Sequence, residues 1–181
     1  MASNNIYRQT GYFIRANTNG KSIIDEIKRD LKKDVDKLGK QLLQRVCEIF
    51  VEIAKNNLLA SGYNVDNLVD NIVARPYGDN KYRIGIRNNS EKPIMYFLEF
   101  GTGVVGRDNP HPEASQIGWQ YLMNQHKSKN GNPLNGWYYY DEERDEWVFT
   151  RGLKAVSYLY DTLQQMPQII EQAKKEIGFN E

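Results

Sequence analysis

The chain has 181 residues, of which 40% are hydrophobic and 26% charged, and its formal net charge is +1 at pH 7. This composition excludes a disordered chain and predicts a globular protein with a sizeable core, while the near-zero charge excludes a strong general attraction to nucleic acid or membrane. We expect no signal peptide and no membrane-spanning helix, and the single cysteine, Cys47, predicts a buried structural thiol in a reducing compartment.

The first elements in chain order are an arm and a helix. Residues 1–20 are predicted to be a flexible N-terminal arm, and 21–181 a single domain. Ser22 is a candidate N-cap. Apolar residues then recur in steps of three or four, which predicts one helix from Ser22 to Ala60: Ile27, Leu31, Val35, Leu38, Leu42, Val46, Ile49 and Ile53. Such a helix is roughly 58 Å long. It must therefore either bend at Gly39 or project beyond its own domain.

A hairpin and a short helix are predicted next. Residues 71–76 and 82–87 read as two strands joined by a turn. Residues 93–100 are apolar nearly all round and predict a short buried helix, although so short a run also fits a strand. Gly101 is expected to end this helix in the left-handed conformation. Glu99 is its only charged residue, and we expect the amides of Thr102 and Gly103 to satisfy it.

The rest of the chain predicts two further helical regions and a second hairpin. Residues 114–123 are expected to form a helix, residues 137–140 and 146–150 a hairpin around an acidic turn, and residues 153–177 a helix divided at Pro167. This order of elements predicts an α+β fold, in which an antiparallel sheet of hairpins packs against a long N-terminal helix and a C-terminal helix.

Three glycines, Gly101, Gly103 and Gly106, match the G-x-G-x-x-G fingerprint of dinucleotide-binding proteins. That fingerprint requires a helix to begin at the third glycine and an acidic residue about 20 positions later. Pro110 and Pro112 oppose a helix after Gly106, and the later acidic residue is missing. We therefore predict that the motif binds no nucleotide.

Other candidate sites are also weak. His111 could bind a metal together with Glu99 and Glu113, but a surface-loop histidine held between two prolines is the favoured interpretation. The acidic residues 141–146 lack the glycine and ligand spacing of a calcium loop, so a solvated hairpin tip is favoured. Because no nucleophile, acid and base converge in the sequence, we predict no enzyme activity, no cofactor and no metal site.

Five segments of the chain form a further pattern: YFLEFGTG at 96–103, NPHP at 109–112, NLVDNIV at 67–73, GWYYY at 136–140 and WVFTRG at 147–152. With these segments the chain resembles the tail-completion and head–tail joining (neck) proteins of long-tailed bacteriophages, and the resemblance spans residues from about 25 to 175. It implies a structural protein without catalytic residues. The residues assigned to its structural motif and interface are Tyr96, Glu99, Phe100, Gly101, Thr102, Gly103, Pro110, His111, Pro112, Trp137 and Trp147.

The resemblance also implies partners and a location. It implies a homo-oligomeric ring of six or twelve subunits in the virion neck, synthesised and assembled in the host bacterial cytoplasm. The ring would contact a head-side connector protein and a tail terminator or tail tube protein, and DNA would pass through its lumen without sequence-specific binding. The arm and the 101–113 loop are expected to become ordered on assembly. The alternative is a DNA-binding or regulatory protein of a prophage or mobile element, using the basic face of helix 21–60; a hydrolase is a distant third.

Overall fold

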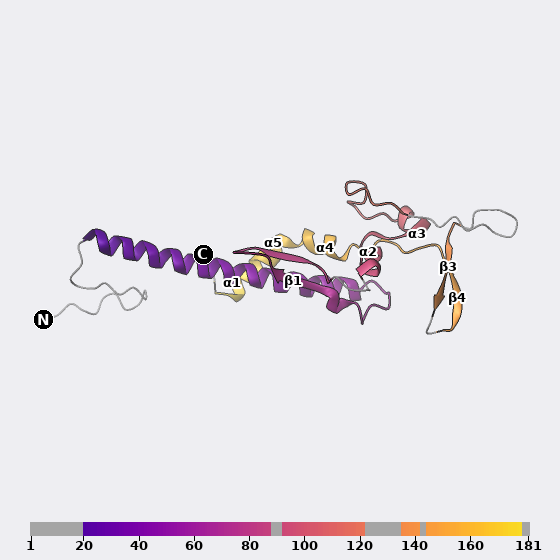
Figure 1. Ribbon diagram of the computed structural model, residues 1–181, viewed down its shortest axis with the longest axis horizontal. Coiled ribbons are helices and arrows are strands. Elements are labelled where there is room, and N and C mark those ends of the chain that lie inside the picture. Colours follow the sequence, from indigo (N-terminus) through magenta and orange to yellow (C-terminus); the bar gives the residue numbers. More distant parts are fainter. Residues whose placement is uncertain (1–19, 88–91, 122–134, 142–143, 179–181) are drawn as a thin grey trace.

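The structure, a computed structural model, describes residues 20–87, 92–121, 135–141 and 144–178. Its longest element is α1 (Gly20–Leu59), a helix of 40 residues that begins two residues before the predicted N-cap and continues without a break through Gly39. Figure 1 shows that the N-terminal part of α1 extends well beyond the other described elements. Of the two expected possibilities, the helix therefore projects. The predicted arm, residues 1–20, lies outside the described residues except for Gly20.

The apolar stripe of α1 has a different environment in each half. In the projecting half, Leu31 and Val35 are exposed, and Val35 retains 65% of its accessible surface. In the other half the stripe enters the core, where the predicted thiol Cys47 is also buried. This core is one cluster of buried residues: Ile49, Phe50, Ala54, Leu58, Val65, Leu68, Ile72, Met95, Leu98, Tyr158, Ile169 and Ala173.

The strands form two separate hairpins. After a short 3-10 helix (Val69–Asn71), β1 (Ile72–Pro76) pairs antiparallel with β2 (Tyr82–Ile86), and this hairpin packs on α1. The second hairpin, β3 (Trp137–Asp141) with β4 (Glu146–Thr150), is a sheet of its own at the far end of the molecule (Figure 1). The predicted α+β class and strand positions are confirmed. The hairpins do not join into one sheet, however, and the second one stands apart from α1 in Figure 1.

The C-terminal helical region begins later in the sequence than predicted. Residues 151–157 belong to no helix or strand, and the helices are α4 (Tyr158–Gln164) and α5 (Met166–Glu176), which both pack on α1. Pro167 lies in the first turn of α5, as expected. The expectation that residues 153–157 are helical is wrong, because their backbone groups bond to α2 and to the glycine-rich segment instead.

The prediction of a helix at residues 114–123 is also wrong over residues 114–121, which the structure describes. Residues 112–118 form consecutive turns, in which the amides of Ala114 and Gln116 donate to carbonyls three residues earlier. Gly118 has a φ of 69°, in the left-handed region, and stops any continuation as a right-handed helix. Residues 122 and 123 lie outside the described part of the chain.

Candidate interface around the glycine motif

The helix that precedes the glycines is α2 (Lys92–Phe100). Met95 and Leu98 enter the core, whereas Ile94, Tyr96 and Phe97 are exposed. The helix was predicted to be buried, and this is wrong for these three residues, which retain 46%, 38% and 41% of their accessible surface. Gly101 ends the helix with a φ of 78°, so the predicted left-handed cap is confirmed.

The glycines themselves enter a short helix, α3 (Gly103–Asp108). The expectation that the following prolines leave this segment as a loop is therefore wrong for these six residues. The helix begins at the second glycine rather than the third, and it ends at Asn109, immediately before Pro110. The prolines thus determine where the helix stops, but they leave enough chain before them for one short helix.

The segment Arg151–Ser157, which crosses the glycine motif, explains why glycine is needed here. Leu153 is bonded in both directions to Thr102: the Thr102 amide donates to the Leu153 carbonyl at 2.8 Å, and the Leu153 amide donates to the Thr102 hydroxyl at 3.1 Å. A Cβ atom on either Gly101 or Gly106 would lie 2.9 Å from the Leu153 carbonyl oxygen. The glycine spacing therefore allows two backbone segments to cross closely, and the amides of Thr102 and Gly106 already donate to carbonyls.

Glu99 lies beneath this crossing and is 3% exposed. One carboxylate oxygen accepts from the Leu159 amide at 2.9 Å, and the other accepts from the Tyr160 amide at 3.1 Å. These amides belong to the first turn of α4, where a carboxylate also interacts favourably with the helix dipole. The predicted donors, Thr102 and Gly103, were wrong, because the helix that Glu99 caps is distant in sequence.

His111 completes the surroundings of Glu99. Its Nδ1 accepts from the amide of Glu113 at 3.0 Å, so this nitrogen carries no proton. The other nitrogen, Nε2, therefore carries the proton of the neutral ring and donates to Glu99 at 3.1 Å. His111 is 4% exposed, and the prediction of a surface-loop histidine is wrong. Because both ring nitrogens are engaged, the ring has no free lone pair for a metal.

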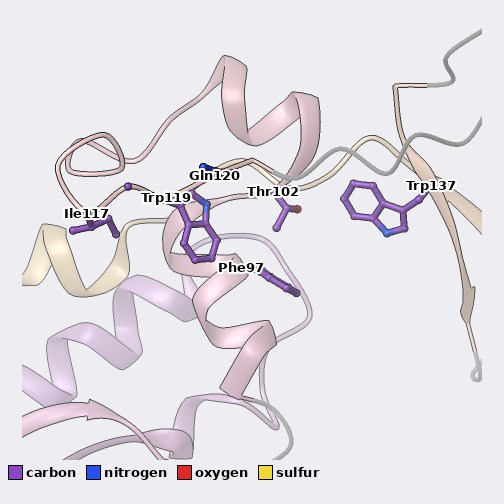
Figure 2. A pocket seen from close by; sticks show the side chains of 7 residues that line it. Phe97, Thr102, Ile117, Trp119, Gln120 and Trp137 are labelled. Carbon is purple, nitrogen blue, oxygen red and sulfur yellow. The ribbon is translucent and has the colours of Figure 1, made fainter.

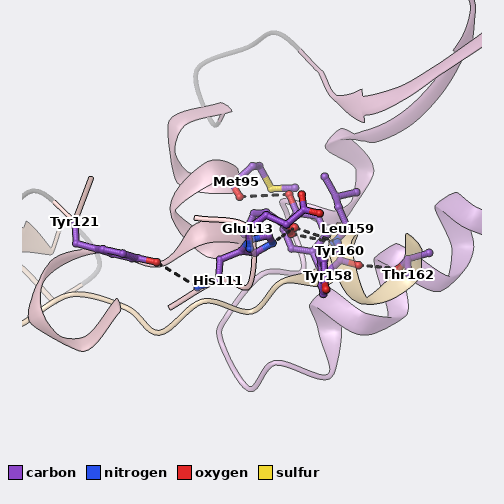
Figure 3. Close-up of polar contacts among 9 residues, drawn as sticks. Met95, His111, Glu113, Tyr121, Tyr158, Leu159, Tyr160 and Thr162 are labelled. Atoms are coloured by element: carbon purple, nitrogen blue, oxygen red, sulfur yellow. Dashed lines mark hydrogen bonds and ion pairs between the residues drawn. The ribbon is translucent and has the colours of Figure 1, made fainter. Parts of the chain in front are cut away.

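Burial also determines the titration of this cluster. Desolvation raises the pKa of Glu99 above its ordinary value, and the amides of Leu159 and Tyr160, together with His111, offset part of this increase. Burial likewise raises the pKa of Tyr158, whose hydroxyl donates to the Met95 carbonyl at 3.3 Å. Figure 3 shows Tyr158, Tyr160 and His111 close together, with Tyr121 reaching the His111 amide from the other side. The network joins α2, α4 and the proline-containing segment into one rigid unit.

An open groove of about 550 Å³ lies beside the network. Figure 2 shows it between Phe97 of α2, Trp119 of the segment after α3, and Trp137 of β3. The Trp119 indole is fixed, since its N–H donates to the Gly101 carbonyl at 3.1 Å and its ring lies 4.9 Å from that of Phe100. A smaller hollow of about 270 Å³ is lined by Tyr96 and Tyr160 among others. Both are mainly apolar, as expected of a protein–protein contact.

The structure brings most of the predicted interface residues together. Glu99, Gly101, Gly103 and His111 are buried at the centre. The half-buried or exposed residues around them are Tyr96, Phe100, Thr102, Pro110, Pro112 and Trp137. Trp147 lies apart on β4 and is 68% exposed. Their role as an interface is a prediction that this placement alone does not test.

Sequence reasoning missed Trp119, Ile117 and the Arg151–Ser157 segment. The only available signal was the size of Trp119, because a tryptophan ring is a large apolar surface whose N–H finds a partner when it is buried. Nothing in the sequence pairs residue 153 with residue 102.

Among the described residues, no three side chains of His, Cys, Asp or Glu are grouped so that they could hold a metal ion. In the same part of the chain, no helix has both the length and the apolar character required to cross a membrane.

Comparison with protein families gave one match. Residues 21–101 match the family described as "Bacteriophage HK97-gp10, putative tail-component". These residues comprise nearly all of α1, the first hairpin and α2, and they end at the glycine that terminates α2. Comparison with curated proteins gave no match, and neither did comparison with solved structures. Over residues 21–101 the chain is thus similar to a family of phage tail components, which confirms its resemblance to structural proteins of the phage virion.

Proposed function

We propose that this chain is a ring-forming protein of the virion neck, which completes the tail or joins it to the head by connecting the head-side connector to the tail tube. The role is structural, without catalysis, metal or cofactor. The observation that carries the proposal is the match of residues 21–101 to a phage tail-component family. The finer position in the neck rests on the segments at 96–103 and 109–112, which resemble tail-completion and joining proteins.

The surface of the subunit supports a role in assembly. The projecting half of α1 leaves Leu31 and Val35 exposed, and α2 exposes Ile94 and Phe97 beside an apolar groove. The second hairpin adds several exposed aromatic side chains. Soluble monomers rarely leave so much apolar surface uncovered, whereas subunits of a larger assembly cover it with their neighbours.

The alternative, a DNA-binding or regulatory protein, has less support. Six basic residues of α1 between positions 28 and 40 are exposed, but acidic residues alternate with them, and Lys33 lies 3.8 Å from Asp30. A surface of mixed sign neutralises few phosphates. DNA in the lumen of a ring needs no tighter contact than this.

The proposal is tested by deleting the gene from the phage or prophage that encodes the chain. DNA-filled heads and tails should both form but remain unjoined or unfinished under the electron microscope, and the wild-type chain supplied from a plasmid should restore joined particles. Normal infectious particles without the chain would refute the proposal. A mobility shift of duplex DNA that weakens steeply with salt, together with such normal particles, would favour the alternative instead.

A further inference from the structure

The two hairpins carry opposite charges. From Ile72 to Arg87 the chain has four basic residues and one acidic residue, and from Trp137 to Thr150 it has five acidic residues and one basic residue. We name these segments the basic hairpin and the acidic hairpin. Each is a sheet of only two strands, which is marginally stable unless something packs against it.

The basic hairpin has a charged outer face. Its inner residues, such as Ile72 and Ile84, pack on the core side. On the other face Arg75 lies directly opposite Arg83, an arrangement of like charges that destabilises a strand pair. The guanidinium of Arg83 lies 4.1 Å from the centre of the Tyr77 ring. Within the described residues, neither arginine forms an ion pair with a carboxylate.

The outer face also has room for a partner. Gly85 lies opposite Val73, and a Cβ atom placed on Gly85 would meet no other atom within 4 Å. The space over Gly85, next to the two arginines, is therefore open. Guanidinium groups exposed in this way bind carboxylates and also stack on aromatic rings.

The acidic hairpin offers both of these groups. Asp141 lies opposite Glu146 at its acidic end, again a like-charged pair, and Arg144 lies 3.6 Å from Asp141 and 4.0 Å from Glu146. The face opposite to these two carboxylates carries four aromatic side chains that are all exposed: Tyr138, Tyr140, Trp147 and Phe149. Ring pairs within this face, such as Tyr140 with Trp147 at 5.5 Å, hold it as a rigid surface.

One molecule cannot bring its own two hairpins together. Figure 1 shows them set apart along the long axis, with α2 and α3 between them. We propose that the acidic hairpin of one copy docks through its aromatic face on the outer face of the basic hairpin of a second copy, so that arginine–aromatic pairs form between subunits and the opposite net charges of the two hairpins attract each other. The contact is head-to-tail, and such contacts close into rings when the rotation permits. The inference deepens the proposed function, since it names the surfaces through which the ring forms.

Sedimentation velocity of the purified full-length chain tests this contact. The wild type should associate as its concentration rises, and less at high salt. Arg75→Glu with Arg83→Glu makes the basic hairpin acidic, so that it repels the acidic hairpin, and should weaken association at least about tenfold. Asp141→Lys with Glu146→Lys makes the acidic hairpin basic and should weaken association to a similar extent. Mixing the two variants should restore association, because each then meets a partner of opposite charge. Lys37→Glu with Lys40→Glu makes the same change of charge on exposed α1 residues and should behave like the wild type.

Asp141 also accepts from the Arg144 amide, so its replacement can disturb the turn. Glu146→Lys alone avoids that contact, and it should also weaken association. A wild-type chain that stays monomeric at every concentration would overturn the proposal, as would hairpin variants that associate like the wild type or a mixture without restoration. These results leave the particle experiment unaffected: if deletion still separates heads from tails, the neck role stands and the ring forms through another surface.

Discussion

At the scale of single residues, Glu99 connects two helices that are distant in sequence. Its carboxylate caps the first turn of α4, and its own carbonyl accepts from the Ser157 amide at 3.1 Å. Ser157, the residue before α4, forms no capping bond through its own side chain. A serine before a helix ordinarily caps it; here the Glu99 carboxylate of α2 caps α4 instead.

Replacing Glu99 with alanine should destabilise the fold. The change leaves the amides of Leu159 and Tyr160 buried without an acceptor, at a cost of about 1–3 kcal/mol in the free energy of unfolding. Urea denaturation monitored by circular dichroism measures this cost. Glu52→Ala, at an exposed position on α1, is the matched control and should change stability by less than about 0.5 kcal/mol. Equal stabilities of the two variants would contradict the capping role.

The stability contributed by Glu99 should depend on pH. The pKa of Glu99 is higher in the folded state than in the unfolded state, so the folded state binds the proton more tightly. The stability that this proton contributes is fully present below the ordinary pKa of a glutamate. It is lost as the pH rises through the raised pKa of the folded state. The free energy of unfolding of the wild type, minus that of Glu99→Gln, should therefore fall from pH ~4 upward. A difference that grows with pH would show that the folded pKa is lowered instead.

Gly101 and Gly118 distinguish two reasons why a position requires glycine: its backbone conformation and a close contact with another segment. Both have positive φ, so alanine at either position should cost about 1–2 kcal/mol in backbone strain. At Gly101 the new Cβ would also lie 2.8 Å from the Ala155 amide nitrogen, whereas at Gly118 it would meet nothing within 4 Å. Gly101→Ala should therefore lower the melting temperature more than Gly118→Ala does. Identical losses would mean that the crossing of the 151–157 segment tolerates a methyl group.

At the scale of elements, α1 has one apolar stripe with two environments. Ile49→Ala should cost about 2–5 kcal/mol in the free energy of unfolding, because it leaves a cavity in the core. Val35→Ala, on the same stripe but 65% exposed, should change stability by less than about 0.5 kcal/mol. Urea titrations of both variants measure the difference. A large loss at Val35 would mean that this half of α1 is covered within the single subunit.

The hairpins show the same dependence on their surroundings. Both were predicted from two short strand-like runs on either side of turn residues, and both lie within about one residue of their predicted positions. Their relation to α1 was not predictable from these signals, since each strand pair is defined locally. The first packs on α1, while the second leaves its aromatic side chains exposed.

At the scale of the whole molecule, the projecting helix determines the shape. A compact chain of this length has a radius of gyration of about 16 Å. The 40 residues of α1 alone extend about 60 Å. Small-angle scattering, extrapolated to zero concentration so that only the monomer contributes, should give a radius clearly above 16 Å. A value close to it would mean that α1 bends or unfolds in solution.

The sequence by itself determined the local features. The spacing of apolar residues predicted α1, strand-like runs around turn residues predicted both hairpins, and Gly101 and Pro167 marked a helix end and a helix start. Each of these signals involves residues that are close together in the sequence, so it can be recognised without knowledge of the fold. The family similarity of residues 21–101 likewise depends on sequence alone.

Only the tertiary structure decided which distant groups meet. Residues 153–157 were predicted as helix, yet they form none, because Thr102, Leu98 and Glu99 bond to their backbone. His111 was predicted as a surface residue between prolines, yet it is buried, and a carboxylate 12 positions earlier accepts a hydrogen bond from its Nε2. In both cases a partner distant along the chain outweighs a weak local preference, since a buried polar group must be satisfied wherever its partner comes from.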